Sequence, residues 1–360
     1  MVILIAAILM IPTGCGKVSG DEPPADETGS VSVGNSAESP VQSQSGMINP
    51  LTGQVGSFDT GVNRQPVVVV VSNYRYSRWQ SGISKAEVII ELPSESGQTQ
   101  MLCFFSDIRD VGVIGPVDCV YSPAAGIIGG VNPFVVFNGY PAECSDIFFE
   151  TGDQKAMNGD SDDSILYVDA ERRTEYLLEY SFFSDGERIA AAADKRVANR
   201  EEDGKAWLSF VLPEEGKFIP ESGSARSITA IFSGIYDVDL HYDDEIAKYN
   251  KFQFLFSQTD KAANYEQLSF DNAFILFAEM KNAIDLNGVR GRLVEVDYSK
   301  GGEGYYFFGG RFEKIGWRLG EDGTLLSFVD SGGQQLAVNT GSTYIAVVNR
   351  QNEYTLKISG

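Results

Sequence analysis

Short runs of β-branched and aromatic residues, bounded by Gly, Pro, Ser or Asn, recur through the first half of the chain. Five valines follow one another from Val67 to Val71, a run too short for a helix and typical of a strand that is buried on both faces. Similar runs occupy Val88–Leu92, Met101–Phe105 and Phe134–Phe137. We therefore expect these four segments to be buried strands of a sheet.

Helical patterns follow these strands. The segment Ala170–Tyr180 is rich in Glu, Arg and Leu, and Glu187–Asn199 is rich in alanine and follows the turn residues Asp185 and Gly186. Because this half combines buried strands with helices, it predicts a mixed α/β domain, which we place at residues 47–224.

Beyond about residue 224, short apolar or alternating segments follow one another. The pairs Gly309-Gly310, Asp322-Gly323 and Gly332-Gly333 separate several of them and suit hairpin turns that need positive φ. We predict a β-rich, mainly antiparallel domain at residues 225–360, so that the fold class is α+β. The expected strands are Ser227–Phe232, Phe252–Phe256, Ala273–Phe277, Leu293–Tyr298, Tyr305–Phe308, Phe312–Arg318, Thr324–Val329, Gln335–Val338, Thr343–Val348 and Tyr354–Ile358.

The first fifteen residues have the layout of a bacterial lipoprotein signal peptide. An apolar stretch, Val2–Ile11, precedes small residues and Cys15, and it is too short to span a bilayer core of about 30 Å. We expect cleavage before Cys15 and acylation of its thiol with a fatty acid such as palmitate. Two features depart from the pattern: no Lys or Arg precedes Val2, which suggests a translation start further upstream, and Pro12 stands where an aliphatic residue is usual. An ordinary secretion signal and an unprocessed tail are the alternatives.

Residues 16–46 are rich in Ser, Gly, Pro, Asp and Glu and contain no aromatic residue. A segment of this composition cannot repay the entropy of ordering, so we predict a disordered tether. With the lipid on Cys15, the protein would be anchored to the extracellular side of the bacterial cytoplasmic membrane.

Composition limits the partners. The chain has 50 acidic and 28 basic residues and a formal net charge of -22. So negative a surface repels phosphate backbones and anionic lipid headgroups, which excludes nucleic acid and leaves the lipidated Cys15 as the membrane contact. An envelope protein or a cell-wall component is the partner class that remains.

Three cysteines remain beyond Cys15, and their odd number excludes a complete disulfide framework. Cys103 lies in an apolar run and is expected to be buried. A single bridge between Cys119 and Cys144 is left open.

Several segments, taken in series, resemble the YerB-type lipoproteins, a family that carries a domain of unknown function numbered 3048 with N- and C-terminal parts. The resemblance covers most of residues 49–348 and implies an envelope location, but no activity is established for the family. The segments and residues that carry it are Ile48–Gly53, Gln65–Asn73, Gln80–Glu87, Ile114–Val117, Tyr242, Asp243, Tyr249, Gly302, Gly304, Trp317, Asn339 and Gly341.

The departures from the family pattern concern charge. Ser72 replaces an aspartate of the family, Gln100 an arginine, and Asp118 and Tyr121 two further arginines, while Tyr180–Asp185 occupies the place of a His-Asn pair. If the family grips an anionic group with these residues, this chain cannot do so in that way. We expect a neutral to acidic groove, whose candidate residues are Ser72, Asn73, Gln80, Ser81, Gly82, Glu91, Gln100, Pro116, Asp118, Tyr121 and Tyr180.

Other chemistry has weaker support. A Cys119–His241 dyad would need two residues that nothing in the sequence brings together. Asn158, Asp160, Asp162 and Asp169 have the spacing of a calcium loop, but Asp163 stands where the loop needs glycine and Asp169 where it needs glutamate. We therefore favour a solvated acidic turn, with a weak calcium site as the alternative.

Glu87 and Glu91 would lie about 13 Å apart along a strand, too far for a glycosidase pair. We interpret the glycine-rich segments Gly126–Gly130 and Gly301–Gly304 as turns. No residue set specifies a catalytic site, and no cofactor or metal is expected.

These observations favour a binding or scaffolding role. The alternatives are a cell-wall enzyme that uses Glu91, Asp118 and Tyr121 near a groove, and an extracellular solute-binding lipoprotein. An enzyme needs convergent titratable groups, a solute binder needs a cleft between two lobes, and a scaffold needs an exposed apolar patch.

Overall fold

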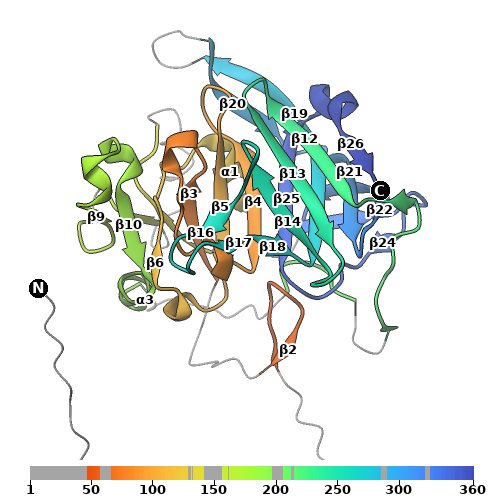
Figure 1. Cartoon of the computed structure of the whole chain (residues 1–360), viewed down its shortest axis with the longest axis horizontal. Helices are drawn as coiled ribbons and strands as arrows, with labels where there is room; N and C mark the ends of the chain where they lie inside the picture. The colour runs from red at the N-terminus through yellow and green to blue at the C-terminus, as the bar shows by residue number, and fades with distance from the viewer. Residues whose placement is uncertain are drawn as a thin grey trace, which may run out of the picture. The chain divides into compact units, whose positions relative to one another are not determined.

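A long β-sheet that draws strands from both halves of the chain forms the centre of the fold (Figure 1). The computed structural model describes residues 47–56, 66–128, 131, 133–141, 156–160, 162–196, 206–211, 215–284, 290–320 and 325–360. The predicted signal peptide and tether lie outside these residues, as do Cys144 and the Asp322-Gly323 turn. Gly46–Gly360 forms one compact unit by its internal contacts.

The central sheet contains thirteen strands among the described residues. In spatial order its main path is β24 (Gln335–Leu336), β23 (Leu326–Val329), β22 (Arg311–Leu319), β21 (Gly302–Phe308), β19 (Asn272–Ile284), β25 (Thr343–Asn349), β4 (Val88–Pro93), β5 (Thr99–Phe105), β3 (Val67–Ser72), β7 (Phe134–Phe137) and β8 (Ala156–Asn158). In addition, β11 (Gly223–Ser224) pairs with β22, and β20 (Arg290–Asp297) pairs with β19. The four strands predicted in the first half are confirmed.

The last long strand of the chain lies in the middle of this sheet. Strand β25 pairs in parallel with β19 on one side and with β4 on the other. Strands β3, β7 and β8 are also parallel to one another, and the other pairs along the path are antiparallel. Residues from both sides of position 224 therefore share one sheet, while the division into domains at that position stays a prediction.

A second sheet of six strands packs on one face of the first. Its strands are β15 (Phe256–Ser257), β14 (Lys248–Gln253), β13 (Tyr236–Asp243), β12 (Ser227–Ser233) and β26 (Lys357–Ser359), with β18 (Ser269–Phe270) beside β14. Three smaller sheets join β6 (Val113–Ile114), β10 (Phe182–Asp185) and β9 (Tyr167–Val168); β16 (Thr259–Asp260) and β17 (Glu266–Gln267); and β1 (Met47–Ile48) and β2 (Val55–Gly56). The expected β-rich, mainly antiparallel C-terminal part is confirmed, while the mixed α/β assignment of residues 47–224 stays a prediction.

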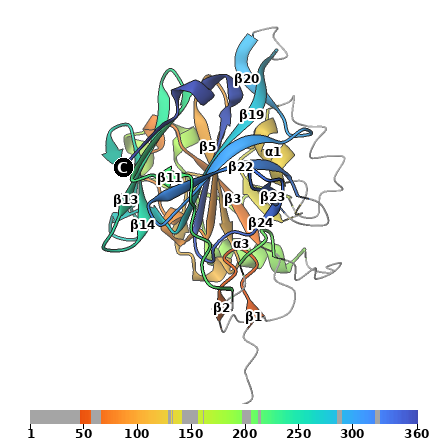
Figure 2. The same cartoon turned by 90° about the vertical axis from the view of Figure 1, so that its right-hand side faces the viewer.

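Alternation along the valine-rich strand β3 builds two cores. Val67, Val69 and Val71 pack with residues of the six-stranded sheet, whereas Val68 and Val70 pack on the opposite side with α1 (Ser122–Ile128). Figure 2 shows β13 and β14 on one side of β3 and β5, and α1 on the other. Because both faces are buried, the strand is apolar at every position, as its sequence indicated.

The described helices are few and short, and one of the two helical expectations needs correction. Ala170–Tyr180 is not one helix but contains two 3-10 helices, Arg172–Thr174 and Leu178–Tyr180, because the Arg172 side chain turns inward and its guanidinium donates to backbone carbonyls. The alanine-rich segment forms α3 (Gly186–Asp194), which Asp185 caps by accepting from the backbone N–H of Arg188.

Helix α1 was not predicted, because its glycine was interpreted as a turn residue. Gly126 lies inside the helix, where a Cβ atom would stand 2.9 Å from Cε2 of Tyr298. The absent side chain thus lets the helix approach the ring. Similarly, Gly302 and Gly304 lie within β21, and only Gly301 of that segment has positive φ.

The turn predictions had mixed outcomes. Gly309 and Gly310, with φ of 59° and 71°, form the predicted two-residue turn between β21 and β22. The segment Phe252–Phe256 is not one strand: β14 ends at Gln253, and Phe254 and Leu255 form a tight turn with φ of 53° and 65°. Strand β26 is shorter than predicted, because Arg350–Thr355 is a 3-10 helix.

Candidate functional site

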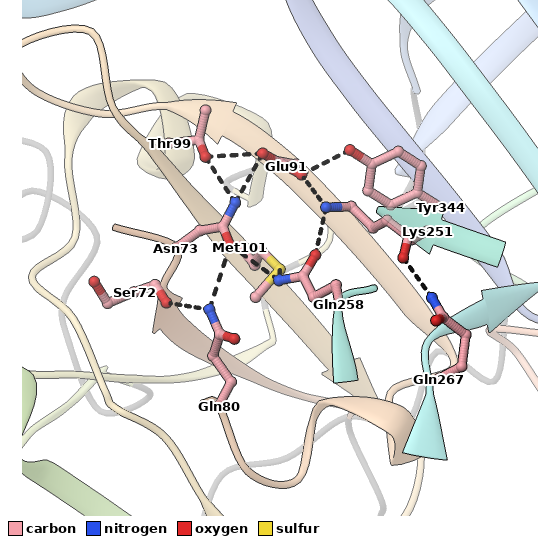
Figure 3. A network of polar contacts seen from close by, with 10 residues as sticks. All are labelled: Ser72, Asn73, Gln80, Glu91, Thr99, Met101, Lys251, Gln258, Gln267 and Tyr344. Carbon is pink, nitrogen blue, oxygen red and sulfur yellow. Dashed lines mark hydrogen bonds and ion pairs between the residues drawn. The ribbon is translucent and has the colours of Figure 1, made fainter. Parts of the chain in front are cut away.

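A buried polar network surrounds Glu91 on the face of the central sheet that meets the six-stranded sheet (Figure 3). One carboxylate oxygen, Oε1, accepts from Asn73 Nδ2 and from Thr99 Oγ1, each at 2.8 Å. The other oxygen, Oε2, accepts from the Tyr344 hydroxyl at 2.7 Å and lies 3.0 Å from Lys251 Nζ. Each oxygen of Glu91 therefore has two partners.

Strands far apart in the sequence supply this network. Glu91 lies on β4, Tyr344 on β25 and Lys251 on β14, so the ion pair joins the central sheet to the second sheet. Lys251 also donates to Gln258 Oε1, and Gln258 Nε2 donates to Asn73 Oδ1 at 3.0 Å. The side chains of Glu91 and Lys251 are 0% exposed.

The electrostatics of the network are those of a structural ion pair. Burial, followed by the Glu91 carboxylate, raises the pKa of Tyr344, so its hydroxyl stays protonated and donates. The charge of Glu91 is balanced by Lys251 and its acceptor positions are filled. Such a carboxylate has no access to a substrate, although the sequence had placed Glu91 among the groove residues.

A second group of candidate residues gathers at the carboxyl end of β3; we call Ser72, Glu95, Asp118 and Tyr121 the edge cluster. Asp118 follows Val117, which bridges to Val71, and its backbone N–H donates to Val70. Ser72 hydrogen-bonds to the Asp118 carboxyl, and Tyr121 hydrogen-bonds to Glu95, from the β4–β5 hairpin. Open α/β sheets commonly bind ligands at the carboxyl ends of parallel strands such as β3 and β7.

Asp118 is the perturbed acid of this cluster. Burial raises its pKa to about 7, and the charges of Glu95 and Glu179 act in the same direction, against hydrogen bonds from the Cys119 backbone N–H and from Ser72. Burial and the Asp118 charge also raise the pKa of Tyr121. The site is neutral to acidic in character, and its acid changes protonation near physiological pH.

Gln100, on strand β5, lies beside Ser72 of the edge cluster. It pairs with Ser72 across β3 and β5 and is fully buried, and neither atom of its side-chain amide has a hydrogen-bond partner in the described part of the chain. Tyr180 packs against Tyr74, with 5.2 Å between ring centroids and the ring planes tilted by 35°. Burial raises the pKa of Tyr180, and the Glu179 carboxylate adds to the shift.

The candidate groove residues on or next to the strands do not share one face of the sheet. Ser72 and Gln100 point to the α1 side, whereas Asn73 and Glu91 belong to the opposite side. Gln80 bridges the two groups, with Nε2 3.2 Å from the Ser72 carbonyl and 3.3 Å from Asn73 Oδ1.

The other candidates act through the backbone. Ser72 N–H donates to Pro116, Ser81 exchanges hydrogen bonds with Gly115, and Gly82, with φ of 78°, donates to Asp260 Oδ1 at 2.9 Å. These contacts fix the loop between β3 and β4.

The remaining reactive side chains do not converge. Cys103 and Cys119 are both free among the described residues, and because Cys144 lies outside them, the Cys119–Cys144 bridge stays a prediction. Burial raises the pKa of Cys119 to about 12, and its thiol donates to the Asn138 carbonyl at 3.1 Å. His241 is exposed and packs against Phe252, with 4.9 Å between ring centroids.

Among the described residues no group of three or more His, Cys, Asp or Glu side chains could hold a metal ion, and the weak calcium candidate stays a prediction. Three of the four candidate ligands accept hydrogen bonds from other groups of the protein. Asn158 Oδ1 accepts from Gly139 N–H at 2.8 Å, Asp162 accepts from Ser164, and Asp169 accepts from Arg172 N–H.

Lys251, Tyr344 and Gln258 are not predicted from the sequence. For the lysine the pattern is misleading, because in Lys248–Gln253 the polar Lys251 lies on the buried face and the apolar Phe252 on the outer face. A charged residue at an inward position of an amphipathic strand requires a buried partner. The identity of that partner, Glu91, depends on the tertiary fold.

The shared central sheet and the second sheet define a β-rich protein, and sequence comparison identifies its family. Residues 51–199 match the N-terminal domain, and residues 228–345 the C-terminal domain, of the family described as "Protein of unknown function (DUF3048)". The chain belongs to this family.

One relative is the "Putative lipoprotein YerB" of Bacillus subtilis (strain 168), which is 25% identical over 299 residues, 83% of this chain and 85% of the relative. The crystal structure of YerB from Bacillus subtilis superimposes with a TM-score of 0.71 at 23% identity, covering 87% of this chain and 100% of the other. Within the described residues, no helix is long and apolar enough to cross a membrane.

Proposed function

We propose that the protein is lipid-anchored through Cys15 on the extracellular side of the bacterial cytoplasmic membrane, where it binds a ligand or partner without catalysing a reaction. The order of apolar stretch, Cys15 and polar tether supports the anchor. The similarity to a relative named as a lipoprotein supports the same location.

We prefer binding over catalysis because both carboxylate oxygens of Glu91 already have their hydrogen-bond or ion-pair partners. A cell-wall enzyme would need an accessible pair of carboxyl groups, and Glu91 is buried with two partners on each oxygen. The continuous central sheet argues against a solute binder built from two lobes.

The edge cluster is the proposed binding site, and its charge sets the ligand class. Asp118 stands near Glu95 and Glu179, so acidic groups gather at this end of the sheet. Bringing phosphate or carboxylate to such a site would place like charges together. The site therefore favours neutral or cationic groups and rejects anions.

Restoring positive charge tests this proposal. The substitutions Gln100→Arg, Asp118→Arg and Tyr121→Arg should create binding of small phosphorylated and carboxylated glycans, because each guanidinium offers a planar fork of donors. Asp163→Arg, at an exposed turn residue, is the control for added charge. Titration calorimetry measures binding, and thermal unfolding verifies that each variant is folded. Tight anion binding by the unaltered protein would contradict the proposal.

The raised pKa of Asp118 favours a second candidate, acid–base chemistry with Glu95. A carboxyl group that titrates near pH 7 can act as a general acid. In that case Asp118→Asn and Glu95→Gln would each abolish release of soluble fragments from purified cell wall, whereas the binding proposal expects no release from the unaltered protein.

A further inference from the structure

A small pocket lies on the other side of Gln80 from the edge cluster, between the β3–β4 loop and the second sheet. Arg78, Trp79 and Gln80 line it from the loop, and Gln253, Phe254, Ser257, Gln258 and Thr259 line it from β14–β16. The Glu91 network also connects the central sheet to the second sheet next to this pocket.

Two buried polar atoms in this pocket lack partners. Gln253 is 5% exposed, and neither its Nε2 nor the Oγ1 of Thr259 has a hydrogen-bond partner within the described ranges. The neighbouring amides differ, since Gln80 bonds to Asn73 and Gln258 bonds to Lys251. A buried unpaired donor is unfavourable, so a bound group that pairs with it gains that interaction.

Exposed aromatic rings surround the same pocket. Trp79, Phe256 and Tyr265 are 39%, 55% and 50% exposed. Trp79 meets Tyr265 edge-on at 5.9 Å, and the Arg78 guanidinium lies over Trp79 at 4.4 Å and over Phe256 at 4.6 Å. A grouped set of exposed rings is typical of a binding surface.

Two of these rings, Phe256 and Tyr265, lie in or directly after turns with a strained backbone. Phe254 and Leu255 before Phe256, and Asn264 and Tyr265 in the next turn, all have φ between 53° and 65°. Bulky side chains rarely adopt this conformation, because it brings the side chain close to the backbone. Strain of this kind is concentrated at functional sites.

Hydrogen bonds from Arg172 fix the loop that carries Trp79. The buried guanidinium of Arg172 donates to the carbonyls of Arg78 at 2.9 Å, of Tyr76 at 3.3 Å and of Trp79 at 3.4 Å. On the other side, Lys261 N–H donates to the Gln80 carbonyl. The loop is therefore preorganised, which reduces the entropic cost of binding.

We propose that the exposed rings around this pocket bind a neutral sugar unit of a glycan chain, one hydroxyl group of which enters the pocket. The apolar C–H face of a pyranose ring stacks on an indole or phenol ring, while the entering hydroxyl accepts from Gln253 Nε2 and pairs with Thr259 Oγ1. A water molecule alone would satisfy the two polar atoms but would leave the exposed rings and strained turns without a role. This site is separate from the edge cluster, so either proposal can fail without the other.

The test uses the Gly46–Gly360 unit and a tetramer of β-1,4-linked N-acetylglucosamine. Trp207 and Trp317 are buried, so a change in tryptophan fluorescence and protection from acrylamide quenching would report on the exposed Trp79. Calorimetry should show binding that Trp79→Ala and Gln253→Met each weaken about tenfold. Tyr354→Ala, at an exposed ring outside the pocket, should change nothing.

Gln253→Met separates a binding role from a structural one. Because the amide nitrogen is unpartnered, this variant should keep or gain stability while its sugar affinity falls. The inference is overturned if no binding occurs up to about 10 mM sugar, or if both pocket variants bind like the unaltered protein. A response of Trp79 to phospholipid vesicles but not to the glycan would overturn it in favour of a membrane contact.

Discussion

Replacing Lys251 by Met should destabilise the protein strongly. The ammonium group is the cation that lies 3.0 Å from the fully buried Glu91 carboxylate, and it also donates to Gln258. Methionine has a similar length and fills the space, so the main effect is an uncompensated buried charge. Removing one partner of a buried ion pair costs about 3–5 kcal/mol.

A second substitution should recover most of this loss. In the double variant Glu91→Gln with Lys251→Met, no buried charge remains, and the amide oxygen still accepts from Asn73 and Thr99. The amide nitrogen can donate to the Tyr344 hydroxyl oxygen. We expect the double variant to lie within about 1–2 kcal/mol of the unaltered protein, because a buried pair is roughly neutral against uncharged groups of similar volume.

Urea unfolding of the Gly46–Gly360 unit, followed by circular dichroism and tryptophan fluorescence, measures these differences. Lys281→Met is the matched control, because Lys281 also forms an ion pair, at 2.9 Å from Glu295, but its side chain is 78% exposed. That control should leave the unfolding midpoint unchanged. A loss below about 1 kcal/mol for Lys251→Met, or strictly additive single-variant losses, would refute the reasoning.

Three further predictions concern other parts of the chain. Cys15→Ala should abolish labelling by a radioactive fatty acid and leave the protein unprocessed or shed; equal labelling of both proteins would contradict the anchor. Asp118→Asn should flatten the pH dependence of stability: folding raises the pKa of Asp118 from 3.8 to about 7 and so favours its protonated form, and the unaltered protein should lose stability as pH rises from 4 to 7. Solvent screening of this partly exposed carboxyl limits the loss to about 1–2 kcal/mol, and parallel melting curves over that range would argue against the shift. Gly126→Ala should lower stability by about 1–3 kcal/mol, because its Cβ would stand 2.9 Å from the ring of the buried Tyr298, and an unchanged midpoint in chemical unfolding would show that the ring can move.

The strands that could be predicted are those whose pattern is purely local. Val67–Ser72 is apolar throughout because both of its faces are buried, and this leaves a readable signal. Strand β13 (Tyr236–Asp243) was not predicted, although its alternation of buried residues with aspartates is a local pattern that indicates a half-buried strand. Ala170–Tyr180 has helical composition, but the inward contacts of Arg172 override that propensity.

The candidate site shows the same limit. Ser72, Gln100, Asp118 and Tyr121 were grouped by their places at strand ends and by the family pattern, and the structure brings Ser72 and Asp118 into contact. Asn73 was placed in the same groove, although side-chain alternation already predicts that it faces away from Ser72. The pairing of Glu91 with Lys251 spans both family domains, so no local pattern could have supplied it.

The most direct test of the central claim, binding without turnover, is a sedimentation experiment with purified cell wall. The Gly46–Gly360 unit is incubated with the insoluble polymer, after which protein in the pellet and soluble saccharide in the supernatant are both measured over time. The account predicts that the protein sediments with the polymer and that soluble saccharide stays at the level of a protein-free control. Saccharide release that grows with time and protein concentration, and that Asp118→Asn abolishes, would contradict it.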